Sequence, residues 1–434
     1  MANYMTAAQA AALIKSGDRV YIQGSTSIPE TLVSALTARA AELRGVEIYT
    51  AFAVGRREAP YCAPGLADSF TVNSFFVAGN IRRAVAEGRA QTIPAFLGEV
   101  PSLFRSGTVP LDVCLLNVSP PDEAGWCSFG ISADLATSAA ECARVIIAQI
   151  NPRIPRTFGD AVIHISRLDA CVETDEPPVE LPAAEPDTVE RAIGRHIAEL
   201  VPDGATLQIG VGGIPNAVLD ALKGHRHLGL HTEAMTDGVV PLLESGVIDN
   251  SQKRVMPGKT VACLALGSRR LYDYMDGNRS LVMKDVAWTN DPQIIRRNPR
   301  VMAINSAIEV DLTGQICADS IGTVIYSGVG GQHDFMYGGA LSPGGKTFIA
   351  LPSLTGRGRS KITATLAPGA GVVTTRFQTQ YVVTEHGAAC LWGKNLAQRA
   401  RALIDIAAPE AREELEREAV RRFGPAFLRL RGGR

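Results

Sequence analysis

The sequence predicts an α/β protein made of two similar open α/β domains with largely parallel sheets. Three observations lead to this prediction: a length of 434 residues, an alternation of short β-rich runs with helical stretches, and a local pattern that occurs twice. A chain of this length is too long for one ordinary core and suits two domains, each with its own apolar interior. Two domains are therefore the starting expectation.

Short strand-like runs alternate with helical stretches along the chain. Residues 46–49, 113–116 and 144–148 are short runs rich in strand-forming residues, which is typical of strands. Residues 28–43 carry the longer pattern of a helix. Strands that alternate with helices form βαβ units, so largely parallel sheets are expected.

The segment over residues 173–186 differs from the chain on either side. It is rich in proline and acidic residues and shows no periodicity. This composition is typical of an interdomain connection. We therefore place the domain boundary near residue 186, with a first domain over residues 1–186 and a second over residues 187–434.

A local pattern occurs once in each predicted domain. Residues 24–36 align without gaps on residues 210–222, an offset of 186, and five of the thirteen positions are identical. Each copy follows an apolar run, continues through a turn of small residues and enters a helix with proline in its first turn, where no donor is lost. We interpret the pattern as an internal duplication, although any unit of strand, turn and helix shares some of these features.

The strands that follow the two copies extend this alignment. Residues 49–51 correspond to residues 231–233, which places Ala51 of the first domain opposite Glu233 of the second. In a duplicated protein, only the second domain would then have kept a reactive carboxylate at this position.

The composition excludes several classes of protein. The 43 Lys and Arg residues nearly cancel the 44 Asp and Glu residues, without long blocks of like charge, so we expect neither a nucleic-acid surface nor a polybasic membrane patch. The eight cysteines are scattered without a C-x-x-C pair, and most are expected to be buried thiols. The start of the chain lacks a signal-peptide pattern, and no apolar run reaches about 18 residues. A soluble cytoplasmic protein with a small-molecule partner is expected.

The first glycine cluster lies at a predicted junction of strand and helix. Gly210, Val211, Gly212 and Gly213 expose backbone N–H groups at a helix N-terminus, which suits a phosphate or a developing oxyanion. The cluster lacks the G-x-G-x-x-G pattern, because Pro215 stands at the third position. A turn that is merely tight is the alternative.

The second glycine cluster is denser and extends over residues 327–345. So many glycines indicate a backbone that approaches a ligand or another backbone closely. The polar residues Gln332, His333 and Asp334 among the glycines favour a site. For Asp334 itself we predict a structural role, in which it caps a helix or binds backbone N–H groups of the loop.

Glu233 follows a predicted strand over residues 228–230. Ligands of open α/β sheets bind beyond the carboxyl ends of strands, so a carboxylate there is well placed for reaction. A helix-start residue or an ion-pair partner is the alternative, and the same holds for His231 and Asp237. The sequence has no G-x-S-x-G or H-E-x-x-H motif, and its seven histidines form no ligand set, so no metal site is predicted.

Ordered stretches along nearly the whole chain carry a resemblance to a known family: residues 79–89, 93–94, 118–125, 209–215, 231–238, 303–315, 328–335 and 382–387. They resemble the acetyl-CoA hydrolase/transferase family of coenzyme A transferases, especially its 4-hydroxybutyrate and butyrate CoA-transferase branch. The resemblance implies two similar open α/β domains with the active site in the cleft between them.

The resemblance also implies roles for individual residues. Glu233 corresponds to the nucleophilic glutamate, and Asn290 resembles an asparagine that helps to stabilise the oxyanion. His333 and Tyr337 depart from the family pattern, where a small or apolar residue and an arginine are expected, and these departures bear on which acid is accepted. The implied CoA-binding residues are Gly210, Val211, Gly212, Gly213, Ile214, Ala307, Ser327, Gly328, Gly330 and Gly331.

The implied activity is transfer of CoA from an acyl-CoA, such as acetyl-CoA or butyryl-CoA, to a short carboxylic acid such as 4-hydroxybutyrate, through a glutamyl-CoA thioester. Three alternatives stay open: an acyl-CoA hydrolase on the same scaffold, a CoA-transferase for a dicarboxylate such as succinate or itaconate, and a catalytically silent CoA-binding protein. No metal or prosthetic group is expected, because CoA itself is a substrate. The resemblance also implies a homodimer or homotetramer.

Overall fold

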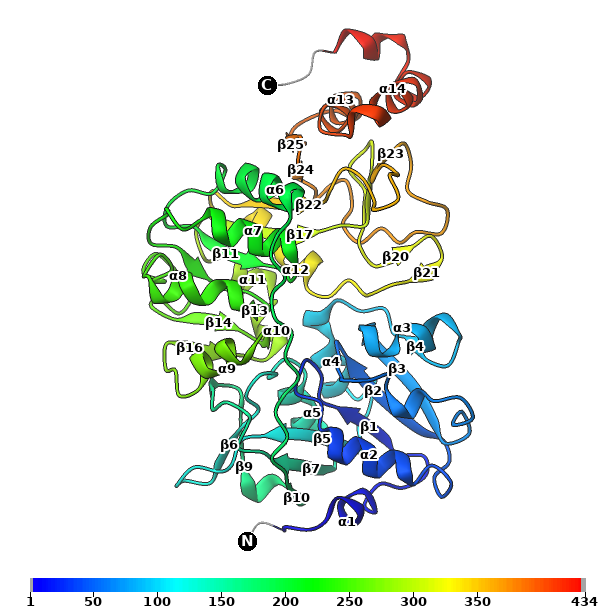
Figure 1. Ribbon diagram of the computed structural model, residues 1–434, viewed down its shortest axis with the longest axis vertical. Helices are drawn as coiled ribbons and strands as arrows, with labels where there is room; N and C mark the ends of the chain where they lie inside the picture. Colours follow the sequence, from blue (N-terminus) through cyan, green and yellow to red (C-terminus); the bar gives the residue numbers. More distant parts are fainter. Residues whose placement is uncertain (1–2, 431–434) are drawn as a thin grey trace.

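The structure, a computed structural model, describes residues 3–430 of the chain. Figure 1 shows two halves, one above the other: the blue to teal part of the chain forms the lower half, and the green to red part forms the upper half. Each half is built around a mainly parallel sheet with helices beside it. The predicted α/β class with two similar domains is thus confirmed.

The first half contains a seven-stranded sheet in the order β10-β7-β5-β1-β2-β3-β4, and all its neighbouring strands are parallel. The predicted strands fall on β2, β5 and β7. The helix predicted over residues 28–43 is shorter, because the backbone leaves the helical conformation at Arg39. The strands are β1 (Arg19–Ile22), β2 (Val46–Ala51), β3 (Phe70–Phe76), β4 (Gln91–Thr92), β5 (Val113–Val118), β7 (Val145–Ile150) and β10 (Ala170–Glu173), and the helices are α1 (Ala7–Ala11), α2 (Glu30–Ala38), α3 (Gly79–Ala86), α4 (Val100–Arg105) and α5 (Ala136–Cys142).

The second half contains a six-stranded sheet in the order β12-β11-β17-β22-β24-β25, in which only β24 and β25 pair antiparallel. Its strands are β11 (Thr206–Ile209), β12 (Gly229–Leu230), β17 (Val301–Ser306), β22 (Lys346–Ala350), β24 (Tyr381–Thr384) and β25 (Gly387–Cys390). The longer helices of this half are α6 (Thr188–Ala198), α7 (Gly213–Ala221), α12 (Gln332–Leu341), α13 (Leu396–Asp405) and α14 (Pro409–Phe423).

Short elements complete the fold. The strands are β6 (Trp126–Ser128), β8 (Phe158–Gly159), β9 (Val162–His164), β13 (Ala234–Thr236), β14 (Thr260–Ala262), β15 (Leu264–Leu266), β16 (Leu281–Met283), β18 (Glu309–Asp311), β19 (Ile316–Cys317), β20 (Ser320–Ile321), β21 (Val324–Ile325) and β23 (Ile362–Thr363). The helices are α8 (Val240–Glu244), α9 (Arg269–Met275), α10 (Val286–Thr289) and α11 (Pro292–Ile295), with 3₁₀ turns at Pro60–Cys62, Leu97–Glu99, Ile165–Arg167, Asp237–Val239 and Pro425–Arg429.

The two main sheets have the same strand order. The sequence β2-β1-β5-β7-β10 in the first half matches β12-β11-β17-β22-β24 in the second. In the first half, β3 pairs with β2. In the second half, His231, directly after β12, forms a β-bridge with Val261 of β14. The likeness that the repeated turn pattern indicated therefore extends over five strands of each sheet.

The pairing of β1 with β2 and of β11 with β12 corrects one alignment. Tyr49 and Leu230 occupy equivalent positions in these pairs. Phe52 and Glu233 each lie three residues further along, so Phe52, rather than Ala51, corresponds to Glu233. The earlier alignment is wrong by one residue, because the helical connections that precede the two strands differ in length.

The two halves pack into one body. β8, from the first half, pairs with β16 of the second in a small sheet, and the largest apolar cluster contains residues of both halves, such as Phe104 and Leu207. Residues 174–187, between β10 and α6, contain neither helix nor strand, and the boundary near residue 186 stays a prediction. Within residues 3–430, the helices are too short or too polar to cross a membrane.

Candidate active site

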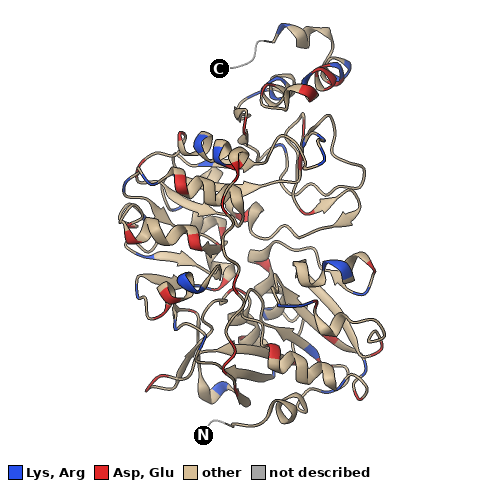
Figure 2. Ribbon diagram, in the orientation of Figure 1, with Lys and Arg blue, Asp and Glu red and all other residues tan. Residues whose placement is uncertain are grey.

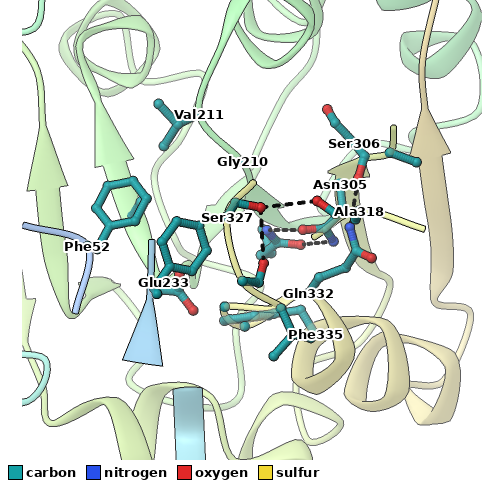
Figure 3. A pocket seen from close by; sticks show the side chains of 18 of the residues that line it. Phe52, Gly210, Val211, Glu233, Asn305, Ser306, Ala318, Ser327, Gln332 and Phe335 are labelled. Carbon is teal, nitrogen blue, oxygen red and sulfur yellow. Dashed lines mark hydrogen bonds between the residues drawn. The ribbon is translucent and has the colours of Figure 1, made fainter. Parts of the chain in front are cut away.

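A cavity of about 480 Å³ lies between the two halves, with Glu233 in its wall. The second half contributes the carboxyl ends of β11 and β17 and the loop that leads into α12, and the first half contributes Phe52, Phe76 and Arg82. Figure 3 shows Phe52, Glu233 and Ser327 around the same space. Ligands of open α/β sheets bind beyond the carboxyl ends of parallel strands, so the cavity has the position expected of an active site.

Local contacts hold Glu233 at the junction of β12 and β13. Its carbonyl oxygen accepts the N–H groups of Cys263 and Leu264 at 3.0 and 3.1 Å. The hydroxyl of Thr232 donates to the carbonyl oxygen of Ile209 at 3.0 Å and ties this junction to β11. The half-buried carboxylate is therefore presented to the cavity from a fixed backbone.

Asn290 supplies a donor to the Glu233 carboxylate. It lies directly after α10 and is 1 % exposed. Its Nδ2 donates to Glu233 Oε2 at 2.7 Å and to Asp334 Oδ2 at 3.3 Å. Its buried Oδ1 has no partner among the described residues. The amide nitrogen, rather than the amide oxygen, is thus directed at the carboxylate that could react.

Gly331 lies next to the same two side chains. It precedes α12, and a Cβ at this position would stand 2.0 Å from Glu233 Oε2 and 2.3 Å from Asn290 Nδ2. Any side chain would therefore displace one of them. The backbone N–H of Gly331 also favours the anionic form of Glu233. The close approach expected for this glycine cluster is made to a carboxylate.

Asp334 lies in the first turn of α12 and is 5 % exposed. Its Oδ2 accepts the N–H of Gly98, in the 3₁₀ turn Leu97–Glu99 of the first half, at 3.2 Å. This contact differs from the predicted one, in which Asp334 caps a helix or binds N–H groups of its own glycine-rich loop. The contact with Asn290 was not predicted. Asp334 therefore also fixes the amide that touches Glu233.

Comparison with known proteins identifies the family. The N-terminal and C-terminal domains of acetyl-CoA hydrolase/transferase match residues 2–181 and 267–419. The chain is 45 % identical, over 96 % of its length, to the 4-hydroxybutyrate coenzyme A transferase of Clostridium kluyveri, of which 97 % is covered. The chain belongs to the acetyl-CoA hydrolase/transferase family. The resemblance found from the sequence is confirmed.

Two further members of the family match over most of their length. One is the succinyl-CoA:acetate/propanoyl-CoA:succinate CoA transferase of Fasciola hepatica, which is 46 % identical over 94 % of this chain and 86 % of the relative. The other is the crystal structure of 4-hydroxybutyrate CoA-transferase from Porphyromonas gingivalis, with a TM-score of 0.84 and 37 % identity over 97 % of this chain and 98 % of that one. The fold is therefore that of the CoA-transferases in this family.

Burial raises the pKa of two carboxyl groups at this site, those of Glu233 and Asp334. Loss of solvent raises the pKa of Glu233 to about 7, and the buried Asp134 adds to the rise, while the Asn290 amide and the Gly331 N–H favour the anion. Burial, followed by the charge of Glu233, raises the pKa of Asp334 to about 7. Carboxyl groups whose pKa is raised toward neutral pH by burial are often found at functional sites.

The structure divides the predicted CoA-binding residues into two groups. Gly210, Val211, Ala307, Ser327, Gly328, Gly330 and Gly331 line the cavity. Gly212, Gly213 and Ile214 do not line it, and their assignment to CoA stays a prediction. They belong to the start of α7, where the Glu190 side chain occupies the space beside Gly213 and where Ile214 packs into the core. Gly213 lies against the Glu190 side chain of α6, which is compatible with the tight-turn alternative.

His231 and Asp237 make structural contacts, but only Asp237 fits the stated alternative, because it begins the 3₁₀ turn Asp237–Val239. His231 is buried against the Trp288 ring, and its Nε2 lies 2.8 Å from the Thr289 carbonyl oxygen. Burial lowers the pKa of His231 to about 3, so it stays neutral. Asp237 accepts the N–H and the hydroxyl of Ser268. Neither side chain lines the cavity.

Several residues of the site escaped the sequence analysis. Phe52, Phe76 and Arg82 come from the first half, where the strand and helix patterns carry no sign of a ligand. Gln208 and Asn305 face each other from β11 and β17, with Asn305 Nδ2 donating to Gln208 Oε1 at 3.0 Å. Gln208 and Asn305 are polar residues within otherwise apolar strands, and this feature of the sequence could have marked them as residues that line a site.

Two further predictions concern metal ligands and cysteines. The described residues contain no group of three or more His, Cys, Asp or Glu side chains that could hold a metal ion. All eight cysteines lie within residues 3–430 and are free thiols, and six of them are buried. The prediction that most cysteines are buried thiols is confirmed.

Proposed function

We propose that this protein transfers CoA between two carboxylic acids, with Glu233 as the nucleophile that carries CoA as a glutamyl thioester. The observation that supports this most directly is the carboxylate of Glu233 in the cavity wall, in contact with the Asn290 amide and beside the N–H of Gly331. These are the parts that covalent transfer of an acyl group requires.

The chemistry conserves the free energy of the thioester. An oxygen of the Glu233 carboxylate attacks the acyl-CoA carbonyl, the C–S bond breaks, and a mixed anhydride forms while CoA leaves as thiolate. The thiolate attacks the Glu233 carbonyl of the anhydride and releases the first acid as carboxylate. The acceptor carboxylate attacks the glutamyl-CoA thioester, and the same two steps in reverse form the new acyl-CoA and free Glu233.

Each of these attacks generates a tetrahedral oxyanion. Asn290 Nδ2–H and the Gly331 N–H lie at the Glu233 carboxylate and are the donors that we assign to this charge. They are held in place before the reaction, Asn290 by Asp334 and Gly331 by the start of α12, so little reorganisation is needed.

Water must be excluded, because attack of water on the glutamyl-CoA thioester converts a transferase into an acyl-CoA hydrolase. Three aromatic rings, Phe52, Phe76 and Phe335, line the cavity near Glu233 and provide an apolar wall. Hydrolysis on the same scaffold is the alternative function, and dependence of turnover on an acceptor acid separates the two.

For the acids, we propose short monocarboxylates: acetate or butyrate as the acyl group of the donor and 4-hydroxybutyrate as an acceptor. A dicarboxylate such as succinate or itaconate is the alternative. CoA and the acids are the partners that this chemistry needs, and the reaction uses no metal or prosthetic group. A cytoplasmic homodimer or homotetramer completes the proposal.

The experiment is to trap the covalent intermediate. The protein is incubated with acetyl-CoA or butyryl-CoA without acceptor, treated with borohydride or hydroxylamine, and digested for mass spectrometry. We expect a modification on the peptide that contains Glu233 and none in Glu233→Ala. An unmodified Glu233 together with steady release of free CoA would contradict the proposal and favour direct hydrolysis.

A further inference from the structure

Arg82 is the one cationic side chain among the described residues that line the cavity around Glu233. Its guanidinium carbon lies 3.8 Å from the centre of the Tyr326 ring, and its Nε donates to the Tyr326 carbonyl oxygen at 2.9 Å. Arg82 belongs to α3 and Tyr326 follows β21, so the contact joins the two halves. Figures 1 and 2 show the basic stretch of α3 next to the β20–β21 hairpin.

The charge of Arg82 has no counter-ion in the described part of the chain. No carboxylate of residues 3–430 lies within 4.0 Å of its guanidinium nitrogens, whereas Arg83 on the same helix pairs with Glu87 at 2.8 Å. Arginine has five N–H donors, and the bond to Tyr326 uses only the Nε donor. A guanidinium that lies over an aromatic ring, with its outer N–H groups open, is suited to a phosphate.

Arg82 lies at the open end of the cavity. Its partner Tyr326 is 41 % exposed and Val211, also in the lining, is 48 % exposed, whereas Phe335 is 1 % exposed. A CoA thioester that reacts at Glu233 has its sulfur at the inner end of the cavity. Its phosphates, at the far end of the pantetheine arm, then point to solvent, which is where Arg82 lies.

We propose that Arg82 binds a phosphate group of the CoA substrate and so makes the enzyme prefer CoA over pantetheine, which lacks these phosphates. The inference rests on the proposed function, because it assumes that CoA enters this cavity. Tyr326 acts as the support that fixes the plane of the guanidinium. A purely structural Arg82, which only ties α3 to the hairpin, would instead affect every ligand equally.

The test measures binding of three ligands to the full chain by calorimetry: CoA, dephospho-CoA and pantetheine. We expect Arg82→Gln to weaken CoA binding roughly 10-fold to 100-fold, as loss of a charge-assisted contact does, and to change pantetheine binding less than about twofold. Binding of dephospho-CoA, which keeps the pyrophosphate but lacks the 3′-phosphate, shows which of these two groups Arg82 contacts. A loss that persists there assigns Arg82 to the pyrophosphate, and a loss that disappears assigns it to the 3′-phosphate.

Arg83→Gln is the matched control, because Arg83 has the same chemistry on the same helix but does not line the cavity. It should leave all three affinities unchanged, and Arg82→Lys, which keeps the charge but not the planar fork, should lose part of the CoA affinity. Unchanged CoA binding in Arg82→Gln, or equal weakening of all three ligands, overturns the proposal. Free CoA binds without reaction at Glu233, so a failure to trap the glutamyl thioester would leave this result intact.

Discussion

Glu233 and Asp334 share a single hydrogen-bond donor. Nδ2 of Asn290 lies 2.7 Å from Glu233 Oε2 and 3.3 Å from Asp334 Oδ2. Burial, followed by the charge of Glu233, raises the pKa of Asp334, and because repulsion between two charges is reciprocal, an ionised Asp334 disfavours ionisation of Glu233. Since both pKa values are raised to about 7, the pair changes its charge near neutral pH.

The rate of glutamyl-CoA formation should rise with pH through about 7, because only the ionised form of Glu233 attacks the acyl-CoA. Asp334→Asn removes the neighbouring charge, so the rise should move to lower pH. Single-turnover formation of the adduct between about pH 5 and pH 9 measures both profiles. Asp311→Asn, a change at a buried carboxyl that binds Thr313 and does not line the cavity, is the control. Coincident profiles for the wild type and Asp334→Asn would contradict this coupling.

Glu233→Gln should raise the melting temperature at alkaline pH. The folded-state pKa of about 7 lies above the reference value of 4.5, so the folded protein binds more protons than the unfolded chain between these values. Stability from this group is therefore lost as pH rises through that window, and the glutamine variant does not suffer the loss. Thermal unfolding at pH 4 and pH 8 compares the two proteins, and an advantage of the variant that is equal at both pH values would refute the explanation.

Gly331→Ala should abolish most of the activity while the protein stays folded. The new Cβ would stand 2.0 Å from Glu233 Oε2, so the carboxylate or the Asn290 amide must move. Misplacement of about 1 Å can cost about 10²-fold in rate. Gly356→Ala, where a Cβ meets no atom within 4 Å, is the matched control. Steady-state rates and circular dichroism decide the outcome, and an active Gly331→Ala enzyme would show that this contact is not required.

Asn290→Ala should lower the rate of adduct formation by about 10²–10³-fold, which is typical of the loss of one oxyanion donor. Its effect on CoA affinity should be small, because Asn290 contacts Glu233 and does not line the cavity. Burst kinetics together with CoA titration separate the two quantities. A loss confined to CoA affinity would assign Asn290 to binding.

Gly213→Ala should destabilise the protein without changing CoA affinity. Its Cβ would stand 2.0 Å from a carboxylate oxygen of Glu190, which caps the start of α6 by accepting the N–H of Asp187. The expected result is a lower melting temperature with an unchanged dissociation constant for CoA. A clear loss of CoA affinity in folded protein would restore Gly213 to the binding site.

Sequence periodicity predicted the α/β class, and the resemblance of ordered stretches along the chain implied the family and the role of Glu233. These features are local: apolar runs define the strands, and the stretch over residues 231–238 carries the glutamate at a strand end. The register between strands is not local. For that reason the alignment of Ala51 with Glu233 failed by one residue, and the pairing of β1 with β2 places Phe52 there instead.

Only the tertiary structure decided which groups surround Glu233. Asn290 and Asp334 lie 57 and 101 residues further along the chain; Asn290 contacts both carboxylates, and α11 packs against both α10 and α12. Gly213 lies against Glu190 of α6, although it belongs to one motif with Gly210, which lines the cavity. Sequence patterns report the propensity of each segment, whereas the contacts between distant segments depend on how the two halves bury their apolar surfaces against each other.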